Sequence, residues 1–252
     1  MQLAEFGEPI AYEIAYDLID ESPSLHELQH RSVVVARKLR ALGIIVLLTR
    51  ADVARFRGNL ATAAEIRRDY LLAARRATSP AEPGRDFAAG RVTGLCDALA
   101  AGQLELARQI ALLSPTQWRP DCEYEDDHCW GRVLQGLVDG PAAPFSEAPA
   151  LLARLKSSLQ GQTSARLASA VALVRRDPVG FAIAFEQLLQ ERALEIDERV
   201  EAGEMDDAVV VSERRVFIEG LALLALADWW GFPTDREYLY CPSMARALLV
   251  ST

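Results

Sequence analysis

Apolar side chains recur at helical spacing along almost the whole chain, and this feature limits the fold more than any other. In the N-terminal third the recurrence gives two runs, Leu25, Leu28, Val35, Leu39, Leu42 and Val46, then Ala63, Ile66, Tyr70, Ala73 and Ala77. Residues three and four apart lie on one face of an α-helix, so each run predicts an amphipathic helix. Ser24 is the predicted N-cap of the first helix, and Gly58-Asn59 is the predicted break between the two.

The same spacing predicts further helices over 87–101, 103–113, 126–138, 148–160, 163–176, 178–202 and 213–230. The first two, hinged at Gly102, look like one helical hairpin of a solenoid, but no second copy recurs at periods of about 33 to 45 residues. Three β-branched runs (33–35, 44–46 and 209–211) could start strands, yet none alternates apolar with polar residues. We therefore predict an all-α fold, a nonrepetitive multi-helix bundle with one solenoid-like hairpin.

The length of 252 residues suits one large domain or two small ones. We predict a single all-helical domain over 1–252, and 139–147, rich in Gly, Pro and Ala, is where a subdomain boundary would fall. The N-terminus lacks the basic region and apolar stretch of a secretory signal. The longest apolar run, 220–231, is interrupted by Asp228 and is shorter than the ~20 residues that span a bilayer. These features favour a cytoplasmic protein that does not enter a membrane.

The segment His26-Glu27-Leu28-Gln29-His30 matches the H-E-x-x-H pattern of zinc metalloproteases. On a helix both imidazoles would share a face and could hold Zn²⁺, with Glu27 activating a bound water. A catalytic zinc needs a third protein ligand, however, and the only other histidine, His128, lies far along the chain. A solvated first helical turn is therefore the preferred interpretation, and a zinc-dependent hydrolase is the weaker alternative. We predict no metal and no other cofactor.

Cys122 and Cys129 lie near His128 and could act as metal ligands or as a nucleophile with its base, but cysteines at the edge of an apolar stripe usually serve packing. The four cysteines are too few and too irregularly spaced for a disulfide framework. The chain has no Gly-rich phosphate loop, no G-x-S-x-G elbow and no dinucleotide motif. No two carboxylates stand out as an acid and a base. We therefore expect a protein that is not an enzyme.

Charge is unevenly distributed along the chain, whose formal net charge is −9. Residues 31–91 carry thirteen Arg and Lys against five acids, whereas 121–127 holds five acids and no base, and 178–207 holds nine acids against two arginines. An acidic face attracts a basic partner and repels the phosphates of DNA and RNA. The alternative interpretation is that these are solvated helix faces that keep the protein in solution.

Aromatic residues accompany the first acidic segment, namely Trp118, Tyr124 and Trp130. Rings beside charges are common at protein interfaces, although they anchor loops to the core as often. The candidate partner-binding residues are Asp121, Glu123, Tyr124, Glu125, Asp126 and Asp127, with a second candidate patch at Glu198, Glu201, Glu204, Asp206 and Asp207.

The C-terminal sequence GLALLALADWWGFP (220–233), followed by EYLYCPSMAR (237–246), resembles the ending of all-helical bacterial immunity proteins. Among these it is most similar to the immunity protein 49 family of polymorphic toxin systems. In that group a long apolar helix ends near a Gly and a Pro and precedes a tail with Tyr and Pro. The resemblance implies a non-enzymatic protein that binds a cognate toxin, often a nuclease delivered by a secretion system such as type VI in bacterial competition.

The resemblance and the charge pattern together predict an immunity protein that neutralises a secreted toxin by direct binding through an acidic surface. Its expected partner is a toxin with a basic surface, and neither nucleic acid nor a membrane. A helical adaptor that binds a peptide or a partner helix is the alternative, and it rests on the 87–113 hairpin.

Overall fold

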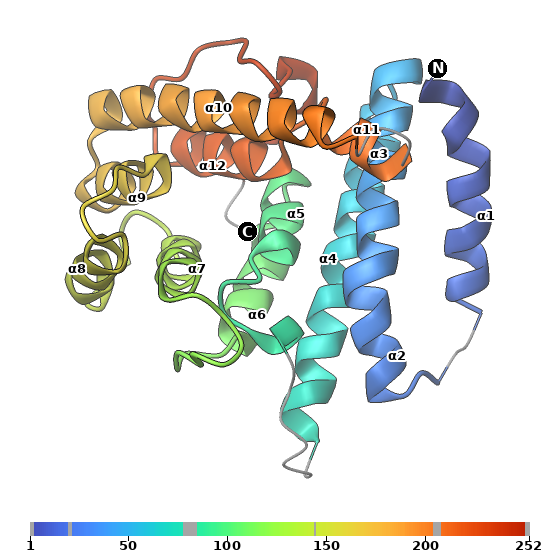
Figure 1. Ribbon diagram of the computed structural model, residues 1–252, viewed down its shortest axis with the longest axis horizontal. Coiled ribbons are helices and arrows are strands. Elements are labelled where there is room, and N and C mark those ends of the chain that lie inside the picture. The colour runs from blue at the N-terminus through green and yellow to red at the C-terminus, as the bar shows by residue number, and fades with distance from the viewer. Residues whose placement is uncertain (1–2, 20–21, 78–84, 144, 204–207, 250–252) are drawn as a thin grey trace.

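The computed structural model of the protein describes residues 3–19, 22–77, 85–143, 145–203 and 208–249 (Figure 1). Its α-helices are α1 (Gly7–Asp17), α2 (Leu25–His30), α3 (Ala36–Arg50), α4 (Val53–Arg76), α5 (Thr93–Ala100), α6 (Leu104–Leu113), α7 (Glu125–Leu137), α8 (Ala148–Ser158), α9 (Ala165–Arg175), α10 (Pro178–Glu201), α11 (Ala208–Glu213) and α12 (Ile218–Trp229). Short 3-10 helices cover Leu3–Phe6, Arg85–Phe87 and Ser243–Ala245, and a π-helical turn, Arg31–Val35, joins α2 to α3. The described ranges contain no β-strand, which confirms the predicted all-α fold.

The helices form two groups that meet along α5 (Figure 1). On one side α1, α3 and α4 stand next to each other, and α3 packs along α4. On the other side α7 packs on α8 and α9 on α10. Between them, α5 packs against both α4 and α12. None of the helices in the described ranges is long and apolar enough to cross a membrane.

The helix break predicted at Gly58-Asn59 is wrong. Helix α4 runs through both residues, and the chain turns earlier, at Ala51, whose φ of 51° is left-handed. The Asp52 side chain then accepts a hydrogen bond from the Arg55 backbone N–H at 2.9 Å, which caps α4. An N-cap bond of this kind stabilises a helix start by about 1 kcal/mol, as much as one interior glycine destabilises it. The cap therefore sets the boundary, and the glycine is tolerated.

Local residues set other helix boundaries, among them the predicted cap at Ser24 and the predicted hinge at Gly102. Ser24 caps α2, and its side chain and backbone both bond to Glu27 in a capping box. Asp177 caps α10, with Pro178 at the first helical position. Gly102, at a φ of 79°, makes the hinge between α5 and α6. The three β-branched runs all lie in helical turns rather than in strands.

The apolar core contains a large and a small cluster. The small cluster joins α1, α3 and α4 through residues such as Ile14 and Leu39. The large cluster includes Leu134 and Leu151, which lie on opposite sides of 139–147. Helix α12 is its centre, because every residue from Gly220 to Ala227 is buried. The assignment of 1–252 as one domain stays a prediction.

A buried ion pair links the two helix groups. The Arg40 Nε on α3 donates to Asp97 Oδ2 on α5 at 2.9 Å, and the Asp97 side chain is completely buried. Its other oxygen, Oδ1, has no partner within the described ranges. Burial disfavours the carboxylate more than Arg40 favours it, and it raises the pKa of Asp97 to about 6.

Stability should therefore depend on pH through Asp97. An unfolded aspartate releases its proton near pH 4, whereas folded Asp97 keeps its proton to about pH 6, so the folded state binds more protons between these values. The contribution of Asp97 to stability is present below about pH 4 and is lost as the pH rises through about 6. Urea unfolding of wild type and Asp97→Asn at pH 4, 5, 6 and 7 should show wild type losing stability relative to the variant as pH rises. An unchanged difference would contradict the prediction.

Candidate functional site

A charged cleft of about 440 Å³ lies beside the acidic segment 121–127. The loop before α5, the loop before α7 and the first turns of α7, α9 and α12 meet there. Its lining residues are Arg85, Ala88, Gly90, Arg91, Val92, Thr93, Pro120, Asp121, Cys122, Glu123, Tyr124, Asp127, Trp130, Arg166 and Glu219. Four of the six predicted residues in the first acidic segment are among them.

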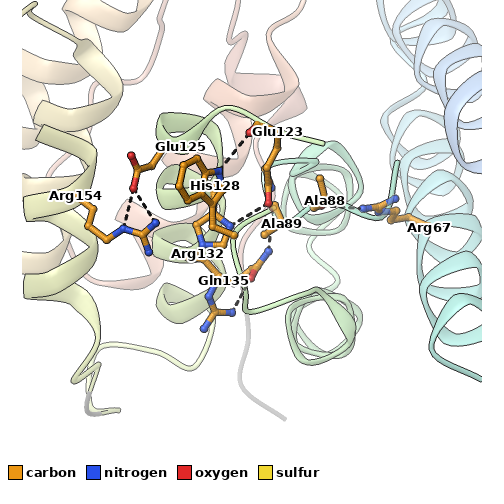
Figure 2. A network of polar contacts seen from close by, with 11 residues as sticks. Arg67, Ala88, Ala89, Glu123, Glu125, His128, Arg132, Gln135 and Arg154 are labelled. Carbon is orange, nitrogen blue, oxygen red and sulfur yellow. Dashed lines mark hydrogen bonds and ion pairs between the residues drawn. The ribbon is translucent and has the colours of Figure 1, made fainter. Parts of the chain in front are cut away.

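Side chains from three directions hold one wall of the charged cleft, the loop 85–92 (Figure 2). Arg67, buried in α4, donates to the carbonyl oxygens of Asp86 and Ala88. Gln135 of α7 donates to the Ala89 carbonyl at 3.2 Å. From the acidic segment, Glu123 Oε2 accepts the Gly90 N–H at 2.7 Å. Because four residues of this short loop are bonded to side chains, its backbone is fixed before any partner arrives.

Glu123 faces the interior, although the sequence suggests an exposed partner-binding acid. Its side chain is 4% exposed, and Oε1 lies 3.1 Å from Nδ1 of the buried His128. Figure 2 shows the carboxylate between His128 and the loop at Ala89. Both oxygens of Glu123 are thus engaged inside the protein. Its position supports the shape of the cleft.

Glu125 and Asp127, in the first turn of α7, pair with arginines of neighbouring helices. Arg154 of α8 donates to Glu125 at 2.7 Å, as Figure 2 shows, and lies over the ring of Trp118 at 5.6 Å. Arg166 of α9 lies 3.5 Å from Asp127. These pairs tie the start of α7 to α8 and α9, so part of the acidity of the segment is balanced locally.

The strongest polar contacts of the cleft join α9 to α12. Arg166 donates to both oxygens of Glu219, at 2.9 and 3.0 Å, and Glu219 also accepts the Trp130 indole N–H at 3.2 Å. Burial opposes the charge of Arg166, but the Glu219 carboxylate outweighs it and raises the arginine pKa. Burial also raises the pKa of Asp127, and Arg166 counters this only in part.

Three members of the acidic segment, two of them exposed, form no side-chain hydrogen bond or ion pair with the described part of the chain. Tyr124 is 80% exposed. Asp121 is exposed and Asp126 half-buried, and neither forms an ion pair within the described ranges. An exposed tyrosine beside unpaired carboxylates is a typical recognition surface, because the ring gives contact area at low entropic cost. These residues form the open part of the candidate site.

The second predicted patch lies elsewhere. Glu198 and Glu201 are exposed on the last turns of α10 and do not line the charged cleft. Acids at a helix C-terminus face the negative end of the helix dipole, so their position does not stabilise α10. Glu204, Asp206 and Asp207 lie outside the described residues.

Two residues of the other chemical motifs, Glu27 and Cys129, are engaged in the fold. Glu27 of the H-E-x-x-H segment is bonded to Ser24. Its Oε2 accepts hydrogen bonds from the Ser24 backbone N–H and the Ser24 hydroxyl, both at 2.6 Å. No group of three His, Cys, Asp or Glu that could hold a metal occurs in the described part of the chain. Cys129 is fully buried, and burial raises its pKa to about 11, far from that of a reactive thiolate.

The alternative function, a helical adaptor, rests on the hairpin at 87–113, and the structure buries one of its two helices. All residues of α5 after Thr93 are buried between α4 and α12, so the hairpin of α5 and α6 exposes little of its first helix. The sequence does not identify Arg166 and Glu219 as residues of the cleft. Arg166 follows Asp127 of the acidic segment by 39 residues and Glu219 lies still further along the chain, so no local pattern links them to that segment.

The fold and the cleft define a class: an all-helical protein with a charged cleft whose framing loop is held by side-chain hydrogen bonds. Residues 82–245 match the family described as immunity protein 49, and the chain belongs to that family. The match confirms the resemblance seen in the C-terminal sequence. The matched range also includes every residue that lines the charged cleft. Comparison with curated proteins and with solved structures gave no match.

Proposed function

We propose that the protein neutralises a cognate secreted toxin by binding it directly through the rim of the charged cleft. The observation that carries this proposal is the exposure of Tyr124 beside the unpaired Asp121, inside the region that matches the immunity family. The walls of the cleft are fixed by buried hydrogen bonds, so binding requires little ordering of the protein.

The charges of this surface favour a basic partner. Of the three arginines that line the cleft, Arg91 lies 3.7 Å from Asp86 and Arg166 lies 2.9 Å from Glu219, while Arg85 is exposed on the loop before α5. Asp121 and Asp126 pair with no such cation among the described residues. An arginine or lysine of the toxin would supply them, and a nuclease, whose active site must hold phosphates, commonly carries such residues. We propose that the toxin is of this kind and that it is bound in the cytoplasm.

Neutralisation in this way needs no catalysis by the immunity protein. Of the carboxylates that line the cleft, Glu123 and Glu219 are each held by internal hydrogen bonds. Glu125 and Asp127 can support the contact by positioning α7. The patch around Glu198 and Glu201, with Glu204, Asp206 and Asp207, remains a second proposed contact.

Co-expression with the toxin encoded beside this gene tests the proposal. Wild type should restore growth, and Asp121→Lys and Tyr124→Ala should each weaken toxin binding by about 2 kcal/mol, roughly 30-fold in Kd, if they lie at the centre of the contact. Both residues are exposed, so the melting temperature should hardly change. Glu198→Lys tests the second proposed contact, on α10, in the same assay.

Titration calorimetry gives the affinities. If both cleft variants bind the toxin as wild type does while Glu198→Lys does not, the contact lies on α10 instead. If wild type neither binds nor protects against the toxin, the proposed function is wrong.

A further inference from the structure

An open apolar groove runs between α8 and α9, outside the charged cleft. Its volume is about 600 Å³. Helix α8 contributes Pro149, Leu152 and Ala153, and α9 contributes Leu167, Val171 and Val174. On α9 these residues are three or four apart, and on α8 Leu152 and Ala153 follow Pro149 by three and four residues, so each helix turns one apolar face toward the groove.

The packing of the two helices explains why the groove stays open. Helix α8 packs mainly on α7, and α9 mainly on α10, while α8 and α9 have few contacts with each other. In Figure 1 they lie at the edge of the molecule opposite the N-terminal helices. Leu151 and Leu155 point into the core, whereas Leu152, Leu167 and Val171 stay partly exposed. A half-covered apolar face of this kind can receive apolar side chains of a partner.

Two exposed cations border the groove, Lys156 on α8 and Arg175 on α9. Neither forms an ion pair within the described ranges, although the chain as a whole is acidic. The nearby Arg154, in contrast, is bonded to Glu125 on the other flank of α8. The groove is therefore a locally basic site with an apolar floor.

We propose that the α8–α9 groove binds an amphipathic helix of a partner protein whose apolar stripe is flanked by acidic residues. A helix with apolar residues at positions i, i+4 and i+7 would lie on Leu152, Leu167 and Val171, and its acids would meet Lys156 and Arg175. The site has the opposite charge preference to the charged cleft. It goes beyond the proposed toxin contact and does not depend on it.

A neighbouring hollow supports a helical occupant of more than two turns. A second cavity of about 620 Å³ shares Lys156 and Leu167 with the groove and continues over the loop 161–164 to α10. There Leu194 is 64% exposed. The apolar surface along α9 from Val174 to Ala165 covers a rise of nine residues, about 14 Å. The second cavity continues this surface toward Leu194.

Binding of two synthetic helical peptides tests the inference. Both are three-turn, hydrocarbon-stapled peptides with Leu at i, i+4 and i+7, and they differ only in having Glu or Lys beside that stripe. Fluorescence anisotropy with the full chain should show saturable binding of the Glu peptide and at least tenfold weaker binding of the Lys peptide. In the double variant Lys156→Glu/Arg175→Glu this preference should reverse.

Arg50→Glu/Arg76→Glu is the matched control, because both residues are exposed near the C-terminal ends of α3 and α4, away from the groove. It should leave the peptide preference unchanged. Equal binding of both peptides, or a preference that survives the Lys156/Arg175 reversal, would overturn the proposal. So would concentration-dependent self-association that the Glu peptide displaces, since a second copy of the chain would then be the occupant.

Discussion

Replacing Gly131 with alanine should destabilise the protein by about 2–3 kcal/mol, although the same change stabilises most helix interiors. Gly131 lies in the middle of α7, where the loop 85–92 crosses the helix. A Cβ at this position would lie 2.8 Å from the Ala89 carbonyl carbon and 3.1 Å from Gly90 Cα. These are backbone atoms of a loop held by Arg67, Gln135 and Glu123, so they cannot move aside without breaking those bonds.

Gly58→Ala is the matched control for this prediction. Gly58 also lies inside a helix, α4, but an added Cβ meets no atom within 4 Å. There alanine should stabilise the fold by about 0.4–1 kcal/mol through the entropy of the unfolded chain. Thermal and urea unfolding of both variants measure the two effects, and the melting temperature of Gly131→Ala should fall by about 4–12 °C. Equal stability of the two variants would contradict the prediction, because it would mean that the loop 85–92 can shift to make room for the added methyl group.

The close contact at Gly131 also has a counterpart on the loop. A Cβ on Gly90 would lie 2.9 Å from the backbone of Asp127, one turn earlier on α7. Two glycines thus bring the loop directly onto the helix, and this places the acidic segment against the loop that forms the opposite wall of the cleft. Toxin binding should therefore weaken in Gly131→Ala without any change in an exposed residue.

Apolar periodicity predicts the fold well because helices in a globular protein are stabilised mainly by burying one face. The buried helix α12 and the capped start of α10 follow directly from their residues. The error at Gly58 has a physical reason. A local propensity of about 1 kcal/mol is outweighed by the packing of Phe56, Leu60 and Ala63, all completely buried on one face of α4.

The candidate site is less predictable, because charge along the sequence does not reveal which carboxylates are buried. The acidic segment contains an internal acid, Glu123, and two acids paired across helices, Glu125 and Asp127. Its other two acids, Asp121 and Asp126, form no ion pair with the residues that the structure describes. Pairing and burial depend on residues distant in the sequence. His128, five positions after Glu123, is the one local signal that could have identified the internal acid.

Glu123→Ala should be the most destabilising change in the acidic segment, by about 2–4 kcal/mol. Its loss would leave the Gly90 N–H and the His128 ring without their acceptor, and a buried polar group without a partner costs about 1–3 kcal/mol. The wall of the charged cleft would lose one of its anchors at the same time. Urea unfolding measures the stability, and amide hydrogen exchange of residues 85–92 should show faster exchange at Gly90.

Asp121→Ala is the control from the same segment, because it removes one negative charge at an exposed position. It should change stability by no more than about 0.5 kcal/mol, while Glu123→Gln should recover part of the loss by keeping an acceptor for the Gly90 N–H. A strong effect of Asp121→Ala on stability, or none of Glu123→Ala, would contradict the division of the segment into internal and external acids. If the division holds, Glu123 variants lose toxin binding in step with their stability, whereas Asp121 variants lose binding alone, because only Asp121 would touch the partner.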